Sequence, residues 1–363
     1  MFLISTRNFP PDVGGIQNLM EGLSNALLSH GPVKVFADDY ANSENYDQKS
    51  SLSIERVGGI RLFRKYRKAN LVNNYLKKNN IRAIFFDHWK SLELIDSEYL
   101  KKIPNFCLVH SKEINHPVGS LLNKRMNKTF KKGNLIIANS KYTKELAISV
   151  GIEEEKIHII NPGTNYPTEI SDEYKKEAKN IYKNSFPKII TIARLDKRKS
   201  HQNIIMTIKN LKTIYPEIKY VCVGDGEEKN NLLDLKKQLN LDENVIFFYK
   251  TNEKLKTALL NESNLFLMPS VKDKKSVEGF GISFIEAASY GKGSIGGISG
   301  GEADAIENGK TGYLCDGSNL NSIYENILKF FENDNYKIIG SQAKEFSKKF
   351  KWSDTVKKYL KLI

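Results

Sequence analysis

Short apolar runs alternate with longer amphipathic segments along the first half of the chain. Mainly apolar runs of this length are typical of parallel strands that are buried on both faces of a sheet. They lie at residues 2–5, 33–37, 83–86, 106–109, 135–138 and 157–160. After the first run, Ile16, Leu19, Leu23 and Leu27 recur at helical spacing. The alternation predicts a doubly wound α/β domain with parallel strands.

A second alternating set begins at residue 188. Its apolar runs lie at 188–192, 220–223, 245–248, 265–268 and 294–295. The chain has 363 residues, which is too long for one ordinary core and agrees with two domains. We predict a first domain over 1–165, a polar linker over 166–187 and a second domain over 188–345. The last segment, 346–363, contains a short helix that we expect to pack back on the first domain.

Polar residues follow several predicted strands. His110, Arg194 and Gly224 each come within two residues of the end of an apolar run. Parallel strands of a doubly wound sheet point the same way, and ligands bind at their carboxyl ends. We therefore expect these three residues and Glu278 to converge on one cleft between the two domains.

Residues 276–287 combine two carboxylates, two glycines and the start of a helix. Glu278 and Glu286 stand eight positions apart, and Gly279 and Gly281 lie between them. Glycine lets backbone amides approach a ligand, and the free N–H groups of a helix N-terminus favour phosphate. The segment predicts a phosphate site flanked by two carboxylates. Taken alone, it is equally compatible with Glu278 as a helix cap and Glu286 as a solvated residue.

The charge balance indicates an anionic partner. Lys and Arg number 56 against 42 Asp and Glu, which gives a net charge of +14. Nucleic acid, an anionic membrane surface or phosphorylated ligands would suit such a chain, and genome composition would explain part of the lysine content. Residues 56–82 carry nine basic residues and 121–132 carry five, with no acidic residue in either segment. Both are amphipathic, so they predict a basic surface that is either solvated or bound to a membrane.

The cysteines and the N-terminus bear on the compartment. Cys107, Cys222 and Cys315 show neither metal nor disulfide spacing, which favours a reducing cytoplasm. The run after Met1 has no basic lead or cleavage site, so we expect a strand rather than a signal peptide. No run approaches the ~20 apolar residues of a membrane span. We expect a cytoplasmic protein that lies at most on the inner face of the membrane.

The order of these motifs resembles that of the retaining glycosyltransferases of family 4, which have two Rossmann-like domains in the arrangement called GT-B. The resemblance covers nearly the whole chain. It rests on residues 10–17, 139–143, 157–163, 193–199, 223–226, 278–286 and 311–314. It implies that the first domain binds the acceptor and the second binds a nucleotide sugar.

Residue roles follow from the resemblance, position by position. Arg194 and Lys199 would bind the donor's diphosphate and neutralise the leaving group. Glu278 would hold hydroxyls of the transferred sugar, Glu286 the ribose hydroxyls, and His110 the sugar near its reacting carbon. The remaining donor contacts are implied for Gly14, Gly15, Gly224, Lys250, Gly279, Phe280, Gly281, Ile282 and Ser283.

Structural roles for some of these residues stay open. His110 would otherwise be a satisfied core histidine, Arg194 and Lys199 solvated cations, and the pair Gly14 and Gly15 a simple turn. The sequence also departs from the family at three places. Ser200 replaces the usual Gly after the lysine, Tyr249 replaces a Gly before the base-binding loop, and 271–276 is rich in lysine.

The resemblance also implies a mechanism and partners. Transfer would retain the anomeric configuration through an oxocarbenium-like state, without metal or other cofactor, and the leaving phosphate would take the acceptor's proton. Residues 277–281 and 299–301 are most similar to the phosphatidylinositol mannosyltransferase group, which favours GDP-mannose over UDP-hexoses or UDP-N-acetylhexosamine. The acceptor would be a lipid-linked or envelope-glycan hydroxyl at the cytoplasmic membrane face.

Other classes of protein were weighed against this hypothesis. A nucleic-acid-binding protein would explain the charge, but the sequence contains no recognised nucleic-acid module. A dinucleotide oxidoreductase is disfavoured because the first glycine loop is not Gly-x-Gly-x-x-Gly. A non-catalytic scaffold that binds nucleotide sugar, a UDP-glucose- or UDP-galactose-dependent glycolipid or polysaccharide transferase, and a GT-B epimerase remain as alternatives.

Overall fold

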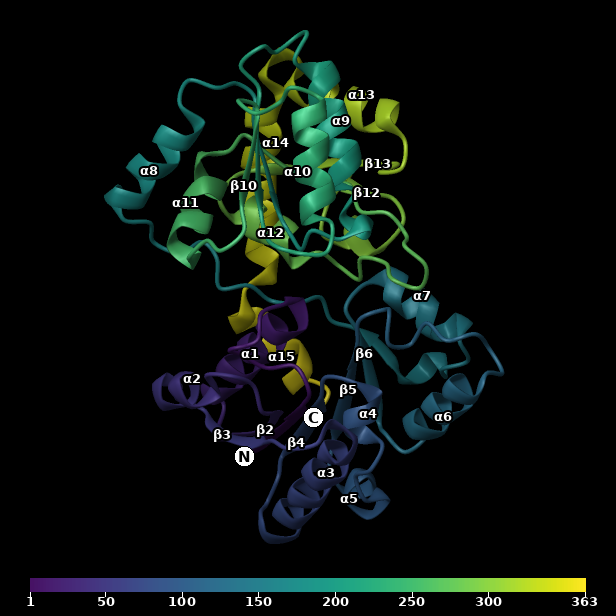
Figure 1. Ribbon diagram of the computed structural model, residues 1–363. Helices are drawn as coiled ribbons and strands as arrows, with labels where there is room; N and C mark the ends of the chain where they lie inside the picture. The colour runs from purple at the N-terminus through teal and green to yellow at the C-terminus, as the bar shows by residue number, and fades with distance from the viewer. The chain divides into compact units, whose positions relative to one another are not determined.

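The computed structural model describes all residues, Met1–Ile363 (Figure 1). The chain divides into two compact units. Unit 1 consists of Met1–Thr164 together with Phe350–Ile363, and unit 2 consists of Asn165–Lys349. Each unit contains one parallel sheet with its own hydrophobic core. The prediction of two doubly wound α/β domains is confirmed.

Unit 1 is built on a seven-stranded sheet with the order β3-β2-β1-β4-β5-β6-β7. All neighbouring strands are parallel. The winding reverses between β1 and β4, and doubly wound sheets bind ligands outside the carboxyl ends of the strands at such a point. The strands are β1 (Phe2–Thr6), β2 (Val33–Asp38), β3 (Ser53–Val57), β4 (Ala83–Phe86), β5 (Asn105–Val109), β6 (Leu135–Ala138) and β7 (Ile157–Ile159).

The helices of unit 1 explain why its apolar runs lack polar alternation. In β4, Ile84 and Phe86 join the core cluster beneath α3, α4 and α6, while Phe85 packs on the other face against Tyr359. Because both faces are covered, every position of the strand is apolar. The helices are α1 (Gly15–Leu28), α2 (Ser43–Lys49), α3 (Arg61–Lys78), α4 (Trp89–Leu92), α5 (Ser97–Lys102), α6 (Leu121–Phe130), α7 (Lys141–Ser149), η1 (Glu154–Lys156) and α15 (Trp352–Leu360).

The final helix of the chain, α15, completes unit 1. The Phe350 carbonyl accepts a hydrogen bond of 2.7 Å from the Thr164 amide, where the returning chain meets the unit. Trp352 packs over Gly22 and Gly163, at which a Cβ atom would come within 2.3 and 2.5 Å of the indole. Glycine is therefore required at both positions for α15 to seat on α1 and on the loop after β7.

Unit 2 is built on a six-stranded parallel sheet with the order β10-β9-β8-β11-β12-β13. Its winding reverses between β8 and β11. The strands are β8 (Lys188–Ile192), β9 (Lys219–Val223), β10 (Val245–Phe248), β11 (Leu265–Met268), β12 (Gly293–Gly297) and β13 (Gly312–Cys315). The helices are α8 (Asp172–Tyr182), η2 (Lys197–Lys199), α9 (His201–Leu211), α10 (Lys229–Gln238), α11 (Glu253–Glu262), α12 (Ile282–Ser289), η3 (Gly301–Asp304), α13 (Leu320–Phe331), η4 (Glu332–Asp334), α14 (Asn335–Ser347) and η5 (Lys348–Phe350).

Several boundaries differ from the sequence-based expectation. The stretch 166–187, which we expected to be a linker, contains α8, a helix that packs on α11. The strands β3 and β13 did not stand out as apolar runs. In β12 the sequence Gly-Ser-Ile-Gly-Gly conceals a fully buried strand, because Ile339 and Phe330 fill the space that a side chain at Gly293 would need.

Two negative findings concern membranes and metals. No helix combines the length and apolar character that crossing a membrane requires. No group of three or more His, Cys, Asp or Glu side chains is arranged as a metal site.

Candidate active site

Three charged side chains meet near the winding reversal of unit 2. Arg198 and Lys199 belong to η2, in the connection that follows β8, and Glu278 belongs to the loop before α12. Arg198 Nη1 lies 2.7 Å from Glu278 Oε2, and Lys199 Nζ hydrogen-bonds to the same oxygen. Lys199 is 8% exposed, and the side chains of Arg198 and Glu278 are each 14% exposed. We call these three residues the ion cluster.

Electrostatics keep Glu278 ionised. Burial alone would raise the pKa of its carboxyl, but the charges and hydrogen bonds of Lys199 and Arg198 outweigh burial and hold the pKa at about 2. Two cations against one carboxylate leave one surplus positive charge, largely shielded from water. Such a charge is suited to an anionic ligand.

The backbone around the ion cluster is fixed by turns and loop contacts. Ser200 has a φ of 57° in the left-handed region, where glycine is favoured. Its hydroxyl donates a hydrogen bond of 2.6 Å to the Gly317 carbonyl. The Val271 amide donates to the Arg198 carbonyl at 2.8 Å. These contacts tie η2 and Ser200 to the loops after β11 and β13.

The helix α12 starts next to Glu278. Its N-cap is Gly281, with a φ of 87° and no side-chain cap, and a Cβ atom there would lie 2.4 Å from the Phe284 ring. Glycine is thus needed both for the backbone conformation and for the close approach. The first amides of a helix have no intrahelical acceptor, and Ile282 and Ser283 supply them here, after the buried pair Gly279 and Phe280.

Glu286 lies within α12, in surroundings different from those of Glu278. It is 9% exposed, and burial, followed by the charge of Glu253, raises the pKa of its carboxyl against the opposing effect of Lys256. The Tyr166 hydroxyl donates a hydrogen bond to Glu253, and Tyr166 lies close enough to Glu286 for the charge of Glu286 to raise the pKa of the phenol. The alternative of Glu278 as a helix cap and Glu286 as a solvated residue is therefore wrong.

Arg194 stands apart from the ion cluster. Its side chain is 75% exposed and pairs with Asp196 at 2.9 Å, while its carbonyl lies 3.1 Å from Nε2 of the buried His201. Gly224 packs against the same connection, since a Cβ atom there would lie 1.9 Å from the Ala193 carbonyl oxygen. Lys250 is exposed just after β10. Of the predicted cations, only Lys199 meets Glu278.

Sequence reasoning missed two charged residues at this site, Arg198 and Glu302. Glu302 lies in η3 with an exposure of 0%. Its Oε1 accepts a 3.3 Å hydrogen bond from the Gly297 amide, and its Oε2 is buried without a hydrogen-bond partner. Both residues were visible in the sequence, Arg198 in the middle of a Lys-Arg-Lys run and Glu302 directly after Gly300–Gly301. Nothing in the sequence indicated that either side chain is buried.

In unit 1, His110 follows β5 and is half-buried. Its Nε2 lies 3.2 Å from the Asp87 carbonyl, and its amide donates to Glu113 Oε1 at 2.5 Å. The neighbouring His88 is also half-buried, and burial lowers its pKa to about 3, which keeps that ring neutral. His110 is thus held at the carboxyl end of the sheet by backbone and carboxylate contacts.

The first glycine loop leads into α1. Gly14 precedes the helix in an extended conformation with a φ of 167°, and a Cβ atom there would lie 2.5 Å from the Gln17 side chain. At Gly15 a Cβ atom would meet nothing within 4 Å. The exposed Val13 and the Asp12–Gln17 hydrogen bond of 2.6 Å complete the loop. Only at Gly14 would a side chain meet a neighbour, and that neighbour is the end of the flexible Gln17 side chain, so local packing requires glycine at neither position.

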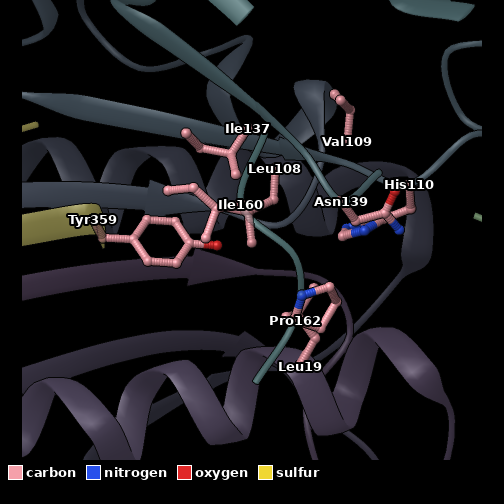
Figure 2. A pocket seen from close by; sticks show the side chains of 9 residues that line it. All are labelled: Leu19, Leu108, Val109, His110, Ile137, Asn139, Ile160, Pro162 and Tyr359. Carbon is pink, nitrogen blue, oxygen red and sulfur yellow. The ribbon is translucent and has the colours of Figure 1, made fainter. Parts of the chain in front are cut away.

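His110 also lines a small pocket within unit 1 (Figure 2). Asn139, at the end of β6, borders the same pocket, and Tyr359 of α15 closes another part of it. The remaining lining residues are Leu19, Leu108, Val109, Ile137, Ile160 and Pro162. The C-terminal helix therefore helps to shape the surroundings of His110.

Family comparisons agree with this geometry. The family model described as Glycosyltransferase Family 4 matches residues 13–166, and the model described as Glycosyl transferases group 1 matches residues 172–349. Together they span nearly all of both units. The chain belongs to glycosyltransferase family 4. Its fold is GT-B.

Curated relatives of this family 4 chain include one archaeal and one mycobacterial protein. An uncharacterized glycosyltransferase of Methanocaldococcus jannaschii is 27% identical over 284 residues, which cover 77% of this chain and 67% of the relative. A GDP-mannose-dependent alpha-(1-6)-phosphatidylinositol monomannoside mannosyltransferase of Mycolicibacterium smegmatis is 24% identical over 334 residues. Those residues cover 88% of this chain and 86% of the relative.

Solved structures share the fold. HepE of Anabaena in complex with UDP superposes with a TM-score of 0.83 at 17% identity, covering 99% of this chain and 98% of that one. HepE in complex with UDP-glucose gives a TM-score of 0.81 at 18% identity, covering 99% and 100%. At this identity the likeness concerns the fold alone.

Proposed function

We propose that this glycosyltransferase moves a hexose from a nucleotide diphosphate sugar to a hydroxyl of a lipid-linked or envelope-glycan acceptor, with retention of configuration and without a metal. The observation that carries the proposal is the ion cluster. Two buried cations share one carboxylate at the carboxyl end of a doubly wound sheet, next to the amides that begin α12. This arrangement supplies positive charge where a metal would otherwise be needed.

The chemistry requires charge stabilisation on the leaving diphosphate. The bond between the anomeric carbon and the diphosphate oxygen breaks, and a bond to the acceptor oxygen forms on the same face of the sugar. The acceptor's proton passes to the leaving phosphate. Lys199, Arg194 and the first amides of α12 stabilise the growing negative charge. Glu278 and His110 bind the transferred sugar, and neither acts as a covalent nucleophile.

For the donor, we propose GDP-mannose first and a UDP-hexose next. The mycobacterial relative named as GDP-mannose-dependent supports the first choice. The HepE structures with UDP and UDP-glucose support the second, although at a lower identity. In either case we assign the ribose hydroxyls to Glu286, which is buried in α12.

The experiment that tests the donor site measures thermal shifts with UDP, GDP and ADP, each with and without EDTA. A nucleotide at ~100 times its dissociation constant adds about 2.7 kcal/mol to the free energy of unfolding. A shift with GDP alone, unchanged by EDTA, supports mannose transfer without a metal. A shift with UDP alone contradicts the choice of GDP-mannose but keeps the class of reaction, and no shift with any nucleotide contradicts a working donor site.

A matched pair of variants connects binding to catalysis. Lys199→Met removes the buried cation that meets Glu278, while Lys197→Met removes an exposed cation two residues earlier. We expect Lys199→Met to lower kcat/KM about 10²- to 10³-fold, which is typical for the loss of one preorganised charge-stabilising group. Lys197→Met should stay within about twofold of the wild type. Equal losses in both variants would contradict the assigned role of Lys199.

We propose that the protein binds its acceptor at an anionic membrane surface. Glu93 joins two helices of unit 1, because its carboxylate pairs with Lys65 of α3 at 3.8 Å and with Arg125 of α6 at 2.7 Å. Near the starts of these helices, large apolar side chains are exposed: Ile60, Leu62, Phe63, Tyr66, Val118, Leu121 and Leu122. Basic residues lie among them: Arg61, Arg64, Lys65, Arg67, Lys124, Arg125 and Lys128. We call both sets together the apolar–basic surface.

Exposed apolar side chains among cations suit the interface of an anionic bilayer, where each cation contributes about 1 kcal/mol. Co-sedimentation with vesicles that contain anionic lipid, compared with neutral vesicles, tests the proposal. We expect the double variant Phe63→Ser, Leu121→Ser to reduce binding, and Ile338→Ser, an exposed apolar position on α14 of unit 2, to leave it unchanged. Equal binding to neutral and anionic vesicles would contradict the proposal.

A further inference from the structure

Glu302 is a buried carboxyl group that the proposed reaction does not use. It is 0% exposed in η3, directly after Gly300–Gly301 at the carboxyl end of β12. Its Oε1 accepts a long hydrogen bond of 3.3 Å from the Gly297 amide, its Oε2 has no hydrogen-bond partner, and the Ser270 hydroxyl lies near the carboxyl group. A buried, incompletely bonded carboxyl group is costly unless it carries a proton or serves a ligand site.

The surroundings of Glu302 place it at the ion cluster. Titratable groups face it from three other elements: Glu278 before α12, Arg198 and Lys199 in η2, and Cys315 at the end of β13. A backbone hydrogen bond also joins η3 to the loop before α12, because the Gly301 amide donates to the Glu278 carbonyl at 2.8 Å. Glu302 and the ion cluster therefore form one electrostatic unit.

The remaining neighbours of Glu302 carry no charge that competes with this unit. Ser270, two residues after β11, contributes a hydroxyl. Asp304, on the same short helix, is only partly buried. Burial raises the pKa of the Cys315 thiol to about 12, so it stays neutral across the working range of pH. The balance of charge thus depends on Glu302, Glu278 and the two cations.

We propose that Glu302 is a positioning residue that sets the charge of the donor site: when neutral it leaves the ion cluster with one surplus positive charge for the donor's diphosphate, and when ionised it cancels that charge. The inference rests on the proposed function, because it assumes that a diphosphate binds at Lys199. It assigns to Glu302 no contact with the reacting atoms. Its effect on the diphosphate passes through Arg198, Lys199 and Glu278.

The protonation equilibrium of Glu302 supports this role. Burial first, and the negative charge of Glu278 second, raise the pKa of its carboxyl to about 8, against the opposing effects of Lys199, Ser270 and the Gly297 amide. Near neutral pH the group is therefore protonated and the ion cluster keeps its surplus charge. As the pH rises past about 8, ionisation of Glu302 removes that charge.

The test measures the dissociation constants of UDP and GDP between pH 6.5 and 9 by isothermal titration calorimetry. For a nucleotide that binds only when Glu302 is protonated, the affinity falls by up to about tenfold per pH unit above the pKa. We expect the wild type to weaken about tenfold between pH 7 and 9. Glu302→Gln, which is neutral at every pH, should bind like the wild type at pH 7 and keep that affinity at pH 9. The control Glu307→Gln, at a half-buried position after η3, should follow the wild type.

A second readout needs no variant. At pH 8, nucleotide binding to the wild type should take up a fraction of a proton, measured as a dependence of the binding enthalpy on the ionisation enthalpy of the buffer. The nucleotide's own terminal phosphate is already ionised there, since its second pKa is near 6. No proton uptake, or a Glu302→Gln protein that weakens with pH as the wild type does, overturns the inference but leaves the donor site in place. If neither nucleotide binds at any pH, the proposed donor site fails and the inference fails with it.

Discussion

Each unit buries a carboxylate at the carboxyl side of its sheet, but the two units neutralise that charge differently. In unit 1, Asp87 Oδ2 accepts hydrogen bonds from the amide of Arg7 at 2.9 Å and from the amide and side chain of Asn8 at 3.2 and 2.9 Å. Ser91 donates to its other oxygen at 2.8 Å. In unit 2, Glu278 instead meets the side-chain cations Arg198 and Lys199.

The difference distinguishes a carboxylate whose partners are fixed in the fold from one whose partners can also bind a ligand. The backbone amides around Asp87 are fixed in the fold, and a ligand cannot take them over without disrupting it. Arg198 and Lys199 have flexible side chains and can divide their charge between Glu278 and an incoming phosphate. The comparison predicts that unit 1 responds to loss of its carboxylate by unfolding and that unit 2 responds by a change in ligand binding.

The largest effect is expected from Asp87→Ala. Burial would raise the pKa of Asp87, but Lys68, His88 and the hydrogen bonds lower it, so a charge with a full set of partners is removed. Breaking a buried network from one side costs about 3–5 kcal/mol. Both tryptophans, Trp89 and Trp352, lie in unit 1, so urea unfolding followed by tryptophan fluorescence reports this unit. A loss below about 1 kcal/mol would contradict the structural role of Asp87.

A smaller and ligand-dependent effect is expected from Glu278→Gln. Without its carboxylate, the two buried cations lose their partner, and unit 2 should lose about 1–3 kcal/mol in the absence of nucleotide. A bound diphosphate then replaces the missing anion. The thermal shift produced by UDP or GDP should therefore be larger than in the wild type, while transfer activity falls. A shift equal to or smaller than that of the wild type would show that the cluster is not exchangeable.

The third prediction concerns the pH dependence of stability. The folded-state pKa of Glu302 is raised from 4.5 to about 8, so its contribution to stability is complete below pH 4.5 and is lost as the pH rises through about 8. Between these values the folded state holds the extra proton, and the slope approaches about 1.4 kcal/mol per pH unit. Thermal unfolding of the wild type and Glu302→Gln between pH 5.5 and 7.5 should show this slope only in the wild type. Parallel curves would contradict the raised pKa.

The smallest change in stability is expected from Arg194→Ala. An ion pair with one side chain 75% exposed contributes about 0–1 kcal/mol. If Arg194 binds the donor's diphosphate, the variant should nevertheless raise the donor KM about tenfold. Measured together, unfolding and kinetics distinguish this exposed cation from the buried Lys199. An unchanged KM would leave Arg194 as the solvated surface cation that the sequence also allowed.

The sequence predicted the parts of the fold that depend on local pattern. Strands such as β4 and β5 were predicted because each is covered on both faces, so that β4 and residues 106–109 of β5 are wholly apolar. The strand β12 was predicted only in part, because its glycines are buried through close packing rather than through apolar side chains. Within the candidate site, Glu278 and Lys199 were predicted from spacing and resemblance. Their contact joins residues 79 positions apart, which no local pattern encodes.

The missed residues illustrate the same limit. Arg198 lies between two other cations in the sequence, and only the turn of η2 decides that it and Lys199 face inward while Lys197 faces solvent. In the sequence Glu302 resembles an ordinary surface acid, but η3 buries it close enough to Glu278 for the two charges to interact. Burial of charge depends on the tertiary structure, so composition and periodicity give no sign of it.

The return of the chain to unit 1 has a consequence for biosynthesis. Unit 2 is complete once Lys349 has left the ribosome. Unit 1 is not, because Gly22, Gly163 and the aromatic face of β4 still lack the side chains of Trp352 and Tyr359. Chains emerge from the N-terminus onward and domains usually fold in that order. Here the unit that is translated first can cover this face of its sheet only after the other has been made, so a stalled or truncated product would present an open apolar face to chaperones.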